Sequence, residues 1–196
     1  MRLIAATRND HKLRELSQIL TGAELVPLPH AVELPPEVGD TFEANALIKA
    51  RATHEACGEA ALADDSGIAA VALGGRPGVR SARYASENAT DQENLDLLIA
   101  ELRDVDDKRV AYVCALAHIA ADGSETVVEA RCEGTLILEP RGTRGFGYDP
   151  AFVPDDTGPE DERTMAELSD SEKHAISHRG RAAREMAARL GMGGRT

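Results

Sequence analysis

The sequence predicts an α/β protein in which helices flank a mixed β-sheet. Short apolar runs that suit buried strands alternate along the chain with segments whose leucines or alanines recur at helical spacing. Two long strand-like runs also meet at Asp122-Gly123, which is a strong signal for an antiparallel hairpin. Alternating helices and strands together with one such hairpin favour a mixed sheet. The chain shows no repeat, low-complexity tract or linker, so residues 1–196 are expected to form a single domain.

The N-terminal part is expected to contain two helices, each preceded by a strand. Residues 3–6 form a short apolar run, and the polar residues after it suit the capping of a helix that ends at Gly22. Residues 25–26 suggest a second strand, and four prolines between positions 27 and 40 predict a loop. The second helix is expected to begin near Thr41 and to end at Gly58.

The rest of the chain contains further strands and three predicted helices. An apolar stretch from 60 to 73 suits a buried strand, but Asp64-Asp65-Ser66-Gly67 interrupts it and is also typical of a turn. The clearest amphipathic helix runs from about 90 to 102. Ser169 and Glu172 have the spacing of a capping box, so a helix should begin there, and the last helix is expected from about 179 to 190.

Composition and charge exclude several classes of function. The 196 residues include 22 basic and 34 acidic side chains, a net charge of −12, and 42% are hydrophobic, which is too apolar for a disordered chain. The negative charge argues against a nonspecific nucleic-acid binder and against docking on an anionic membrane. No apolar stretch is long enough to span a membrane, and the first apolar run is too short for a signal peptide. Three widely spaced cysteines predict a reduced, cytoplasmic protein.

The first candidate site is Thr7-Arg8-Asn9-Asp10-His11-Lys12, where a predicted strand passes into a helix. The free N–H groups and the positive dipole end of a helix N-terminus attract anions. Thr7, Asn9 and Lys12 would add donors around a phosphate. The segment lacks the glycines of a Walker loop, and an ordinary capped helix with a solvated lysine explains the same residues.

The second candidate site is the pair Asp64-Asp65 inside an apolar run. Two adjacent carboxylates are costly there unless cations or hydrogen bonds compensate them. Neighbouring residues of an extended chain point to opposite faces, so only one of the two is expected to face a given ligand. Mg²⁺ prefers carboxylates, water and substrate phosphates, and this pair suits it.

Two further segments carry candidate binding residues. The glycine-rich loop 142–150 would let backbone approach a ligand closely, and Phe146 and Tyr148 could offer stacking faces, although an anchored surface loop is an equal alternative. Lys173 lies in the first turn of a predicted helix, where a cation opposes the helix dipole, so helix stability does not explain it. The segment His178-Arg179-Gly180 marks the start of the last helix.

Taken together, these segments resemble the family of non-canonical purine nucleoside triphosphate pyrophosphatases, the inosine and xanthosine triphosphate pyrophosphatases. The resemblance extends over nearly the whole chain, and the order and spacing of its weak motifs make it specific. The motifs are Thr7-x-Asn9-x-x-Lys12, Thr41-Phe42-x-x-Asn45-Ala46, Ala63-Asp64-Asp65-Ser66-Gly67, Gly74-Gly75-x-Pro77-Gly78, Ser81-Ala82-Arg83-Tyr84, Gly145-Phe146-Gly147-Tyr148-Asp149-Pro150, and Glu172-Lys173 through Ser177-His178-Arg179-Gly180.

The resemblance implies an Mg²⁺-dependent enzyme that cleaves the nucleotide between its α and β phosphates, giving a nucleoside monophosphate and pyrophosphate. It also implies an elongated mixed sheet, two lobes with an active-site cleft between them, and a homodimer. Asp65 would be the catalytic carboxylate and a metal ligand, together with Glu37. Substrate-binding roles are implied for the segment from Thr7 to Lys12 and for Ser66, Phe146, Gly147, Tyr148, Asp149, Lys173, His178 and Arg179.

Two positions depart from the family pattern. Many members have glycine where this chain has Arg8, so the loop is less pliable here or Arg8 extends into solvent. Many members have a glutamate where this chain has Ala44, and the glutamate of this chain, Glu43, lies one position earlier. No carboxylate is therefore present at position 44 to take a role there.

The resemblance predicts that ITP, dITP and XTP are preferred over ATP. Hypoxanthine and xanthine carry an oxygen where adenine carries an amino group, so donors from Arg179 or from loop amides would pair with them and oppose adenine. Such a polar mismatch discriminates by roughly four to five orders of magnitude. Alternatives are a pyrophosphatase with another base preference and a nucleotide-binding regulator without turnover, which the costly Asp64-Asp65 pair argues against. A nucleic-acid-binding module ranks last because of the charge.

Overall fold

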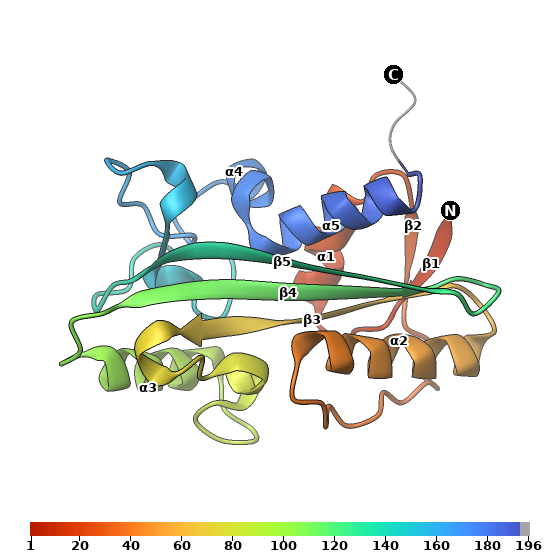
Figure 1. The fold of residues 1–196 in the computed structure, drawn as a ribbon, viewed down its shortest axis with the longest axis horizontal. Coiled ribbons are helices and arrows are strands. Elements are labelled where there is room, and N and C mark those ends of the chain that lie inside the picture. Colours follow the sequence, from red (N-terminus) through yellow and green to blue (C-terminus); the bar gives the residue numbers. More distant parts are fainter. Residues whose placement is uncertain (193–196) are drawn as a thin grey trace. The chain divides into compact units, whose positions relative to one another are not determined.

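A six-stranded sheet with the strand order β2-β1-β3-β4-β5-β6 organises the protein, and helices flank it (Figure 1). The computed structural model describes residues 1–192. The strands are β1 (Arg2–Ala5), β2 (Glu24–Pro27), β3 (Ala61–Ala70), β4 (Arg109–Ile119), β5 (Glu125–Leu136) and β6 (Phe152–Pro154). The helices are α1 (Asp10–Ile19), α2 (Phe42–Cys57), α3 (Asp91–Leu102), α4 (Asp170–Ile176) and α5 (His178–Arg189), and short 3-10 helices include η2 (Gly78–Arg83).

The chain divides into two compact units, each with its own hydrophobic core. Unit 1 comprises residues 1–65, 114–130 and 179–196, and unit 2 comprises residues 66–113 and 131–178. Strands β3, β4 and β5 each contribute residues to both units. The catalytic and substrate-binding residues implied by the family resemblance are therefore distributed over both units. The single domain and the cleft between lobes remain predictions.

Unit 1 contains the parallel part of the sheet. Strand β1 pairs in parallel with β2, where Ile4 faces Val26, and with β3, where Ile4 faces Ala61. The apolar stripe of α1, with Leu16 and Leu20 buried, packs in one cluster with Leu3 of β1 and with Met186 of α5. These pairs are the parallel part of the mixed sheet that the alternation of helices and strands predicts.

Unit 2 contains the antiparallel pairing of β5 with β6, so the sheet is mixed as predicted. Its core gathers Leu95, Leu98 and Leu102 from one face of α3 around Phe152 of β6. The predicted amphipathic helix is thereby confirmed, and its apolar face is the one buried.

Side-chain and glycine caps set several helix ends where the sequence indicates them. The hydroxyl of Thr41 accepts a hydrogen bond from the Ala44 N–H, and Gly58 ends α2 in the left-handed conformation at φ 66°. Ser169 and Glu172 form the predicted capping box at the start of α4. The predicted hairpin turn between β4 and β5 is also present, with Gly123 at φ 83°.

The alternative prediction of a turn at residues 64–67 is wrong, because β3 continues through them as one ten-residue strand. Asp64 and Asp65 are buried within it, and cationic side chains pair with both, which removes the need for a solvated turn. Gly67 serves close packing within unit 2, since a side chain there would collide with the hydroxyl of Ser81.

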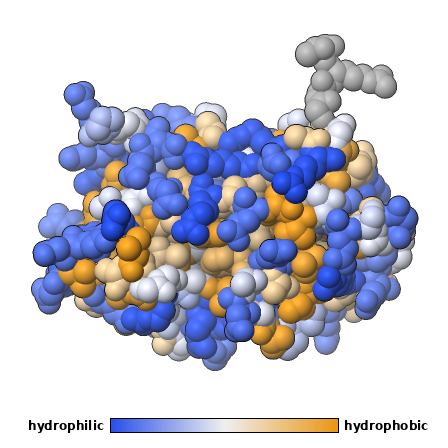
Figure 2. All heavy atoms as spheres, in the orientation of Figure 1, coloured by the Kyte–Doolittle hydropathy of each residue, from blue (hydrophilic) through white to orange (hydrophobic). Residues whose placement is uncertain are grey.

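Charged and polar groups cover much of the molecular surface. Figure 2 shows hydrophilic residues spread over the visible face, with apolar ones between them. Among residues 1–192, large hydrophobic side chains that are well exposed occur at Met1, Val38 and Val71. No helix within the described part of the chain is long and apolar enough to cross a membrane.

Candidate active site

Asp64 lies on β3 at the centre of a buried charge cluster in unit 1. The Nζ of Lys12, from the first turn of α1, lies 2.5 Å from its Oδ1, and the Nε of Arg179 lies 2.8 Å from its Oδ2. The thiol of Cys114 on β4 donates a hydrogen bond to Oδ2 over 3.1 Å. Burial by itself would raise the pKa of Asp64, but Arg179 and Lys12 hold that pKa well below its usual value. Asp64 is therefore a fixed anion.

Asp65 has different partners, as expected for neighbours that point to opposite faces of a strand. The Nζ of Lys49, from α2, lies 3.0 Å from Oδ1 of Asp65 and 2.5 Å from Oε1 of Glu37. Burial, which Lys49 only partly offsets, raises the pKa of Asp65 to about 6. Its second oxygen, Oδ2, is buried and has no hydrogen-bond partner among residues 1–192. Asp65 is thus ionised at neutral pH and keeps one free acceptor.

Glu37 and Asp65 fit a magnesium ion in donor type. Mg²⁺ is commonly held by one or two carboxylates, with substrate phosphates and water completing its shell. The unpartnered Oδ2 of Asp65 could serve as a metal ligand, and Lys49, which contacts both carboxylates, holds Glu37 close to Asp65. Within residues 1–192, no group of three or more His, Cys, Asp or Glu side chains is placed to hold a metal ion. Phosphate and water oxygens would therefore have to complete the shell of an ion at Glu37 and Asp65.

The predicted phosphate segment is a capped helix N-terminus in unit 1. The Oδ1 of Asn9 accepts hydrogen bonds from the N–H groups of His11 and Lys12, and Thr7 Oγ1 accepts from the Asn9 N–H. The capped-helix interpretation is therefore correct for the local structure. It leaves open a binding role for the segment, because Lys12 extends to Asp64 and not into solvent.

Arg8 holds the loop that follows β2. Its guanidinium donates to the carbonyls of Leu28, Pro29 and Val32 over 2.7–2.8 Å. The segment from Thr7 to Asp10, together with Leu13, shares a pocket of about 750 Å³ with residues of that loop between Pro27 and Leu34. Arg8 is exposed, as the alternative of an arginine that extends into solvent predicts, and these carbonyls also hold its guanidinium.

In unit 2, Asp149 organises the second group of predicted site residues. Its Oδ1 accepts a hydrogen bond from the Tyr112 hydroxyl over 3.1 Å. Its Oδ2 accepts from Lys173 Nζ over 2.7 Å and from the Phe146 N–H over 3.0 Å. Lys173 also lies over the Phe146 ring, with its Nζ 5.2 Å from the ring centroid. Asp149 thereby joins the glycine-rich loop to α4 and β4.

Aromatic contacts extend this group to His178. The rings of Tyr112 and His178 stack at 4.6 Å between centroids with 7° between their planes. Tyr148 is buried, and its hydroxyl donates to the Ser81 carbonyl over 2.7 Å, so this side chain anchors the loop. Phe146 is only partly buried. Of the loop's two aromatic residues, Phe146 is therefore the one able to offer a stacking face.

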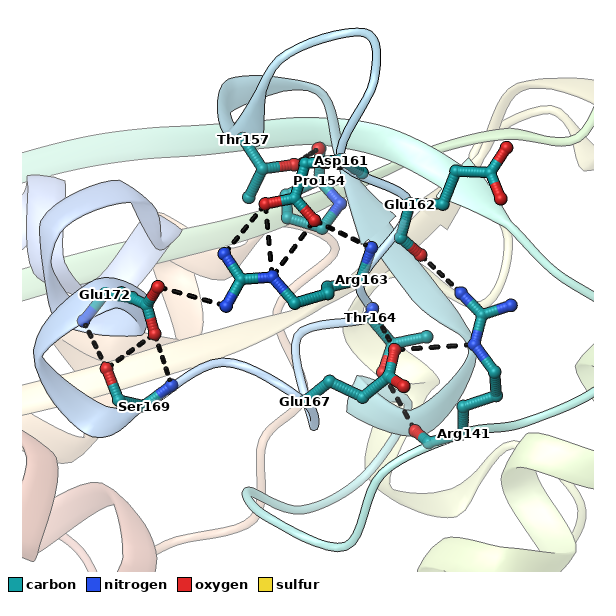
Figure 3. Close-up of polar contacts among 10 residues, drawn as sticks. All are labelled: Arg141, Pro154, Thr157, Asp161, Glu162, Arg163, Thr164, Glu167, Ser169 and Glu172. Carbon is teal, nitrogen blue, oxygen red and sulfur yellow. Dashed lines mark hydrogen bonds and ion pairs between the residues drawn. The ribbon is translucent and has the colours of Figure 1, made fainter.

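The acidic loop 155–163 is tied to its surroundings by arginines (Figure 3). Arg163 forms a fork with Asp161, with Nη2 2.7 Å from Oδ2, and its Nη1 donates to Glu172 Oε1 over 3.0 Å. Glu172 is the capping-box residue of α4, so Arg163 connects the loop to the start of the helix that carries Lys173. Arg141 provides another tie, because it donates to the Glu162 carbonyl and to Glu167.

The structure places the predicted residues in two groups, one in each unit. Unit 1 contains the segment from Thr7 to Lys12, Glu37, Asp65 and Arg179, and unit 2 contains Ser66, Phe146, Gly147, Tyr148, Asp149, Lys173 and His178. Arg179 was predicted to meet the base, but its side chain is 2% exposed and pairs with Asp64 and with Glu15. Its substrate role remains a prediction.

Sequence reasoning missed several members of these groups. Lys49, Glu15 and Cys114 in unit 1 and Tyr112 in unit 2 received no role, although each contacts a predicted site residue. The scarcity of lysine was an available signal for Lys49. The chain has only four lysines, and three of them, Lys12, Lys49 and Lys173, pair with aspartates of the motifs.

Known proteins resemble this chain over almost its whole length. The model of the Ham1 family matches residues 3–189. A dITP/XTP pyrophosphatase of Mycolicibacterium paratuberculosis is 49% identical over 93% of this chain and 92% of its own, and one of Streptomyces avermitilis is 47% identical over 94% of each. Among solved structures, a HAM1 protein from Coxiella burnetii matches with a TM-score of 0.87 and 37% identity, covering 97% of this chain and 98% of its own. A nucleoside-triphosphatase (dITP/XTP pyrophosphatase) from Mycobacterium abscessus matches with a TM-score of 0.75 and 46% identity, covering 95% and 98%.

These matches agree with the order of motifs and with the mixed sheet described above. The family model and the relatives each span far more than half of the chain, and the residues around Asp65 and Asp149 lie within the matched range. The chain belongs to the Ham1 family.

Proposed function

We propose that this protein hydrolyses the deaminated purine nucleotides dITP, ITP and XTP to the nucleoside monophosphate and pyrophosphate, and so removes them from the nucleotide pool. The observation that carries the proposal is Asp65, a buried carboxylate that is ionised at neutral pH and has one unpartnered oxygen beside Lys49 and Glu37. The names of the relatives, dITP/XTP pyrophosphatases, supply the substrate class.

In the proposed reaction Asp65 is the general base. A water molecule attacks the α-phosphorus while the Asp65 carboxylate accepts one of its protons, and the bond between the α-phosphorus and the bridging oxygen breaks. Pyrophosphate leaves with the bonding electrons, and the α-phosphate keeps the hydroxyl oxygen. A general base must be ionised at the working pH, and without a bound metal ion the pKa of Asp65 is about 6, so its carboxylate is ionised at neutral pH.

Neutralisation of the phosphate charge is assigned to the N-terminus of α1 and to a metal ion. Lys12 and the segment from Thr7 would receive the phosphates, since a helix N-terminus favours anions. Glu37 and Asp65 would hold Mg²⁺, which when bound supplies positive charge to the phosphates and lowers the pKa of a bound water. Lys49 keeps the two carboxylates together, and Arg179 with Lys12 fixes the neighbouring Asp64.

Recognition of the base is assigned to residues of unit 2. The Phe146 ring offers a stacking face, and Lys173 beside it is a donor suited to a carbonyl oxygen of hypoxanthine or xanthine. Adenine presents an amino group at the corresponding position, which would face another donor. The Lys173 ammonium would find no acceptor on that amino group, so adenine nucleotides are expected to bind more weakly than those of hypoxanthine or xanthine.

We further propose that the enzyme acts in the cytoplasm as a homodimer and needs neither nucleic acid nor a membrane. The dimer is implied by the family resemblance, and the location is implied by the three widely spaced cysteines. The excess of acidic side chains, 34 against 22 basic ones, supports the exclusion of nucleic acid as a partner.

A substrate panel tests the proposal. The purified protein with Mg²⁺ is given dITP, ITP, XTP, ATP and GTP, and pyrophosphate and orthophosphate are measured separately. We expect release of pyrophosphate from the first three at rates far above those for ATP and GTP. Equal rates for all five nucleotides, or release of orthophosphate alone, would contradict the proposal. Binding of dITP without any release of product would favour a nucleotide-binding regulator.

A further inference from the structure

We infer that Asp91, at the first position of α3, is a positioning residue for the glycine-rich loop 142–150 and thereby for the stacking face of Phe146. The inference rests on the proposed function for the role of Phe146, whereas the contact itself lies within unit 2. None of the motifs discussed above includes Asp91.

The contact is a hydrogen bond between a charged side chain and the loop backbone. The N–H of Gly147 donates to Oδ2 of Asp91 over 2.8 Å, although the two residues are 56 positions apart in the sequence. A hydrogen bond to an ionised carboxylate is about twice as strong as one between neutral groups. This bond connects the tip of the loop to the rigid first turn of a twelve-residue helix.

Helix capping does not account for the carboxylate of Asp91. The neighbours of Asp91 already cap α3, because the Thr90 hydroxyl accepts from the Glu93 N–H and the Glu93 carboxylate accepts from the Thr90 N–H. An acidic residue in the first turn also favours the helix dipole, but that effect needs no contact with another segment. The orientation of Asp91 toward Gly147 therefore serves the loop.

The loop needs such an external contact because of its backbone. Gly145 and Gly147 both have left-handed conformations, with φ of 74° and 64°, so Phe146 lies between two residues that turn the chain sharply. The N–H of Phe146 donates to Asp149, a residue of the same loop, and the N–H of Gly147 donates to Asp91. Of these two backbone bonds, the second is the one that reaches a separate element, α3.

A second connection shows that α3 is suited to this role. Asn94, one turn after Asp91, is buried and donates to the Ala82 carbonyl over 3.2 Å, and it accepts from the Ala85 N–H over 2.9 Å. These bonds fix the segment containing η2 to α3, and η2 supplies the Ser81 carbonyl to which Tyr148 donates. The first two turns of α3 therefore hold this part of the loop in two ways. Asp91 accepts a bond from Gly147 directly, and Asn94 holds the segment with η2, to which Tyr148 is bonded.

The consequence is a separable effect on binding. The chemistry is assigned to Asp65, which has no part in these contacts, whereas Phe146 is assigned to the base. Loss of the Asp91 carboxylate should therefore weaken substrate binding and leave the rate of the chemical step almost unchanged. A general loss of structure would lower both.

Steady-state kinetics of Asp91→Asn tests this separation. We expect KM for dITP to rise about threefold, because the amide oxygen of asparagine can still accept the bond but lacks the charge that strengthens it, with kcat within about twofold of the wild type. Asp91→Glu, which keeps the carboxylate, should recover part of the loss. The matched control is Asp96→Asn, because Asp96 lies on the same helix and accepts only from Gln92 within it. We expect this control to match the wild type.

The amide signal of Gly147 gives a readout that does not depend on turnover. In protein labelled with ¹⁵N-glycine, this amide should lie downfield in the wild type and move upfield in Asp91→Asn, while Asp96→Asn leaves it unchanged. An unchanged Gly147 signal in Asp91→Asn, or a changed signal with unaltered KM, overturns the inference. A wild-type protein that releases no pyrophosphate from dITP overturns the proposed function instead, and the Gly147 signal then still decides whether Asp91 holds the loop.

Discussion

Lys49 and Asp65 form a buried ion pair, with 3.0 Å between Nζ and Oδ1, and the same ammonium group also contacts Glu37. Burial by itself would lower the pKa of Lys49, but Asp65 and Glu37 raise it, so the lysine remains charged. One lysine thus contacts both carboxylates that we assign to magnesium, and the three side chains together keep a net negative charge. The effect of Mg²⁺ on protein stability can therefore be compared with and without Lys49.

Removal of Lys49 should make the protein depend on divalent cations for stability. We expect Lys49→Met to lower the free energy of unfolding by about 3 kcal/mol without Mg²⁺, because it removes the cation that pairs with the buried Asp65 and with the partly buried Glu37. Millimolar Mg²⁺ should raise the Tm of this variant more than that of the wild type, since a ligand stabilises the state that binds it. Lys108→Met is the control, because Lys108 donates only to the Val105 carbonyl. An equal effect of Mg²⁺ on all three proteins would show that Lys49 and the ion do not share these carboxylates.

Replacement of Asp65 should separate binding from turnover. We expect Asp65→Asn to lower kcat for dITP by roughly a thousandfold, the usual range for loss of a general base, while dITP still binds in a titration calorimeter. Asp122→Asn, a change in the exposed turn between β4 and β5, serves as the control and should retain full activity. Turnover of Asp65→Asn near the wild-type rate would remove Asp65 from the catalytic role.

The arginine bridge of the acidic loop should matter more than an isolated ion pair of the same geometry. Arg163 and Arg109 make the same fork with an aspartate two positions before them, but only Arg163 also donates to the capping residue of α4. We expect Arg163→Gln to lower the Tm more than Arg109→Gln and to raise KM for dITP about twofold, an effect as modest as exposed ion pairs allow. Because salt screens exposed charges, high salt should reduce the difference between the two variants. Equal Tm values at low salt would contradict a bracing role.

His118 on β4 should make stability fall in mild acid. Its ring is buried and both ring nitrogens lack a hydrogen-bond partner, and burial lowers the pKa of His118, an effect that Asp122 only partly offsets. Because the pKa is lower in the folded state, neutral His118 makes its full contribution to the free energy of unfolding above the unfolded pKa of about 6.5. That contribution is lost as the pH falls below this value.

Urea unfolding between pH 7.5 and 5 measures this loss. The slope of the unfolding free energy against pH should be smaller in His118→Leu than in the wild type, by at most about 1.4 kcal/mol per pH unit for one proton. His30→Leu changes an exposed histidine and serves as the control. If the unfolding free energies of the wild type and His118→Leu change in parallel with pH, the His118 ring does not contribute to the loss of stability in acid.

Much of the fold follows from local signals in the sequence. The ends of α2 depend on Thr41 and Gly58, and the start of α4 depends on Ser169 and Glu172, all of which act within one helical turn. The opposite partners of Asp64 and Asp65 also follow from strand geometry alone. Such features need no knowledge of distant residues, and for this reason they were predictable.

Other features depend on segments that meet only after folding. Whether residues 64–67 form a turn or a strand is decided by Lys12, Lys49 and Arg179, which come from three different helices. The stacking of Tyr112 on His178 and the bond between Gly147 and Asp91 join positions more than 50 residues apart. No periodicity or spacing rule reports such contacts, so they could not be predicted from the sequence.

The thiol of Cys114, which donates to Asp64, has a consequence for the chemical durability of the enzyme. Burial and the adjacent carboxylate hold the pKa of Cys114 well above its ordinary value, and the residue is fully inaccessible to solvent. Only a thiolate reacts readily with oxidants and alkylating agents. Peroxide or iodoacetamide should therefore spare Cys114 in the native protein, and its labelling would report the moment at which this part of the site opens.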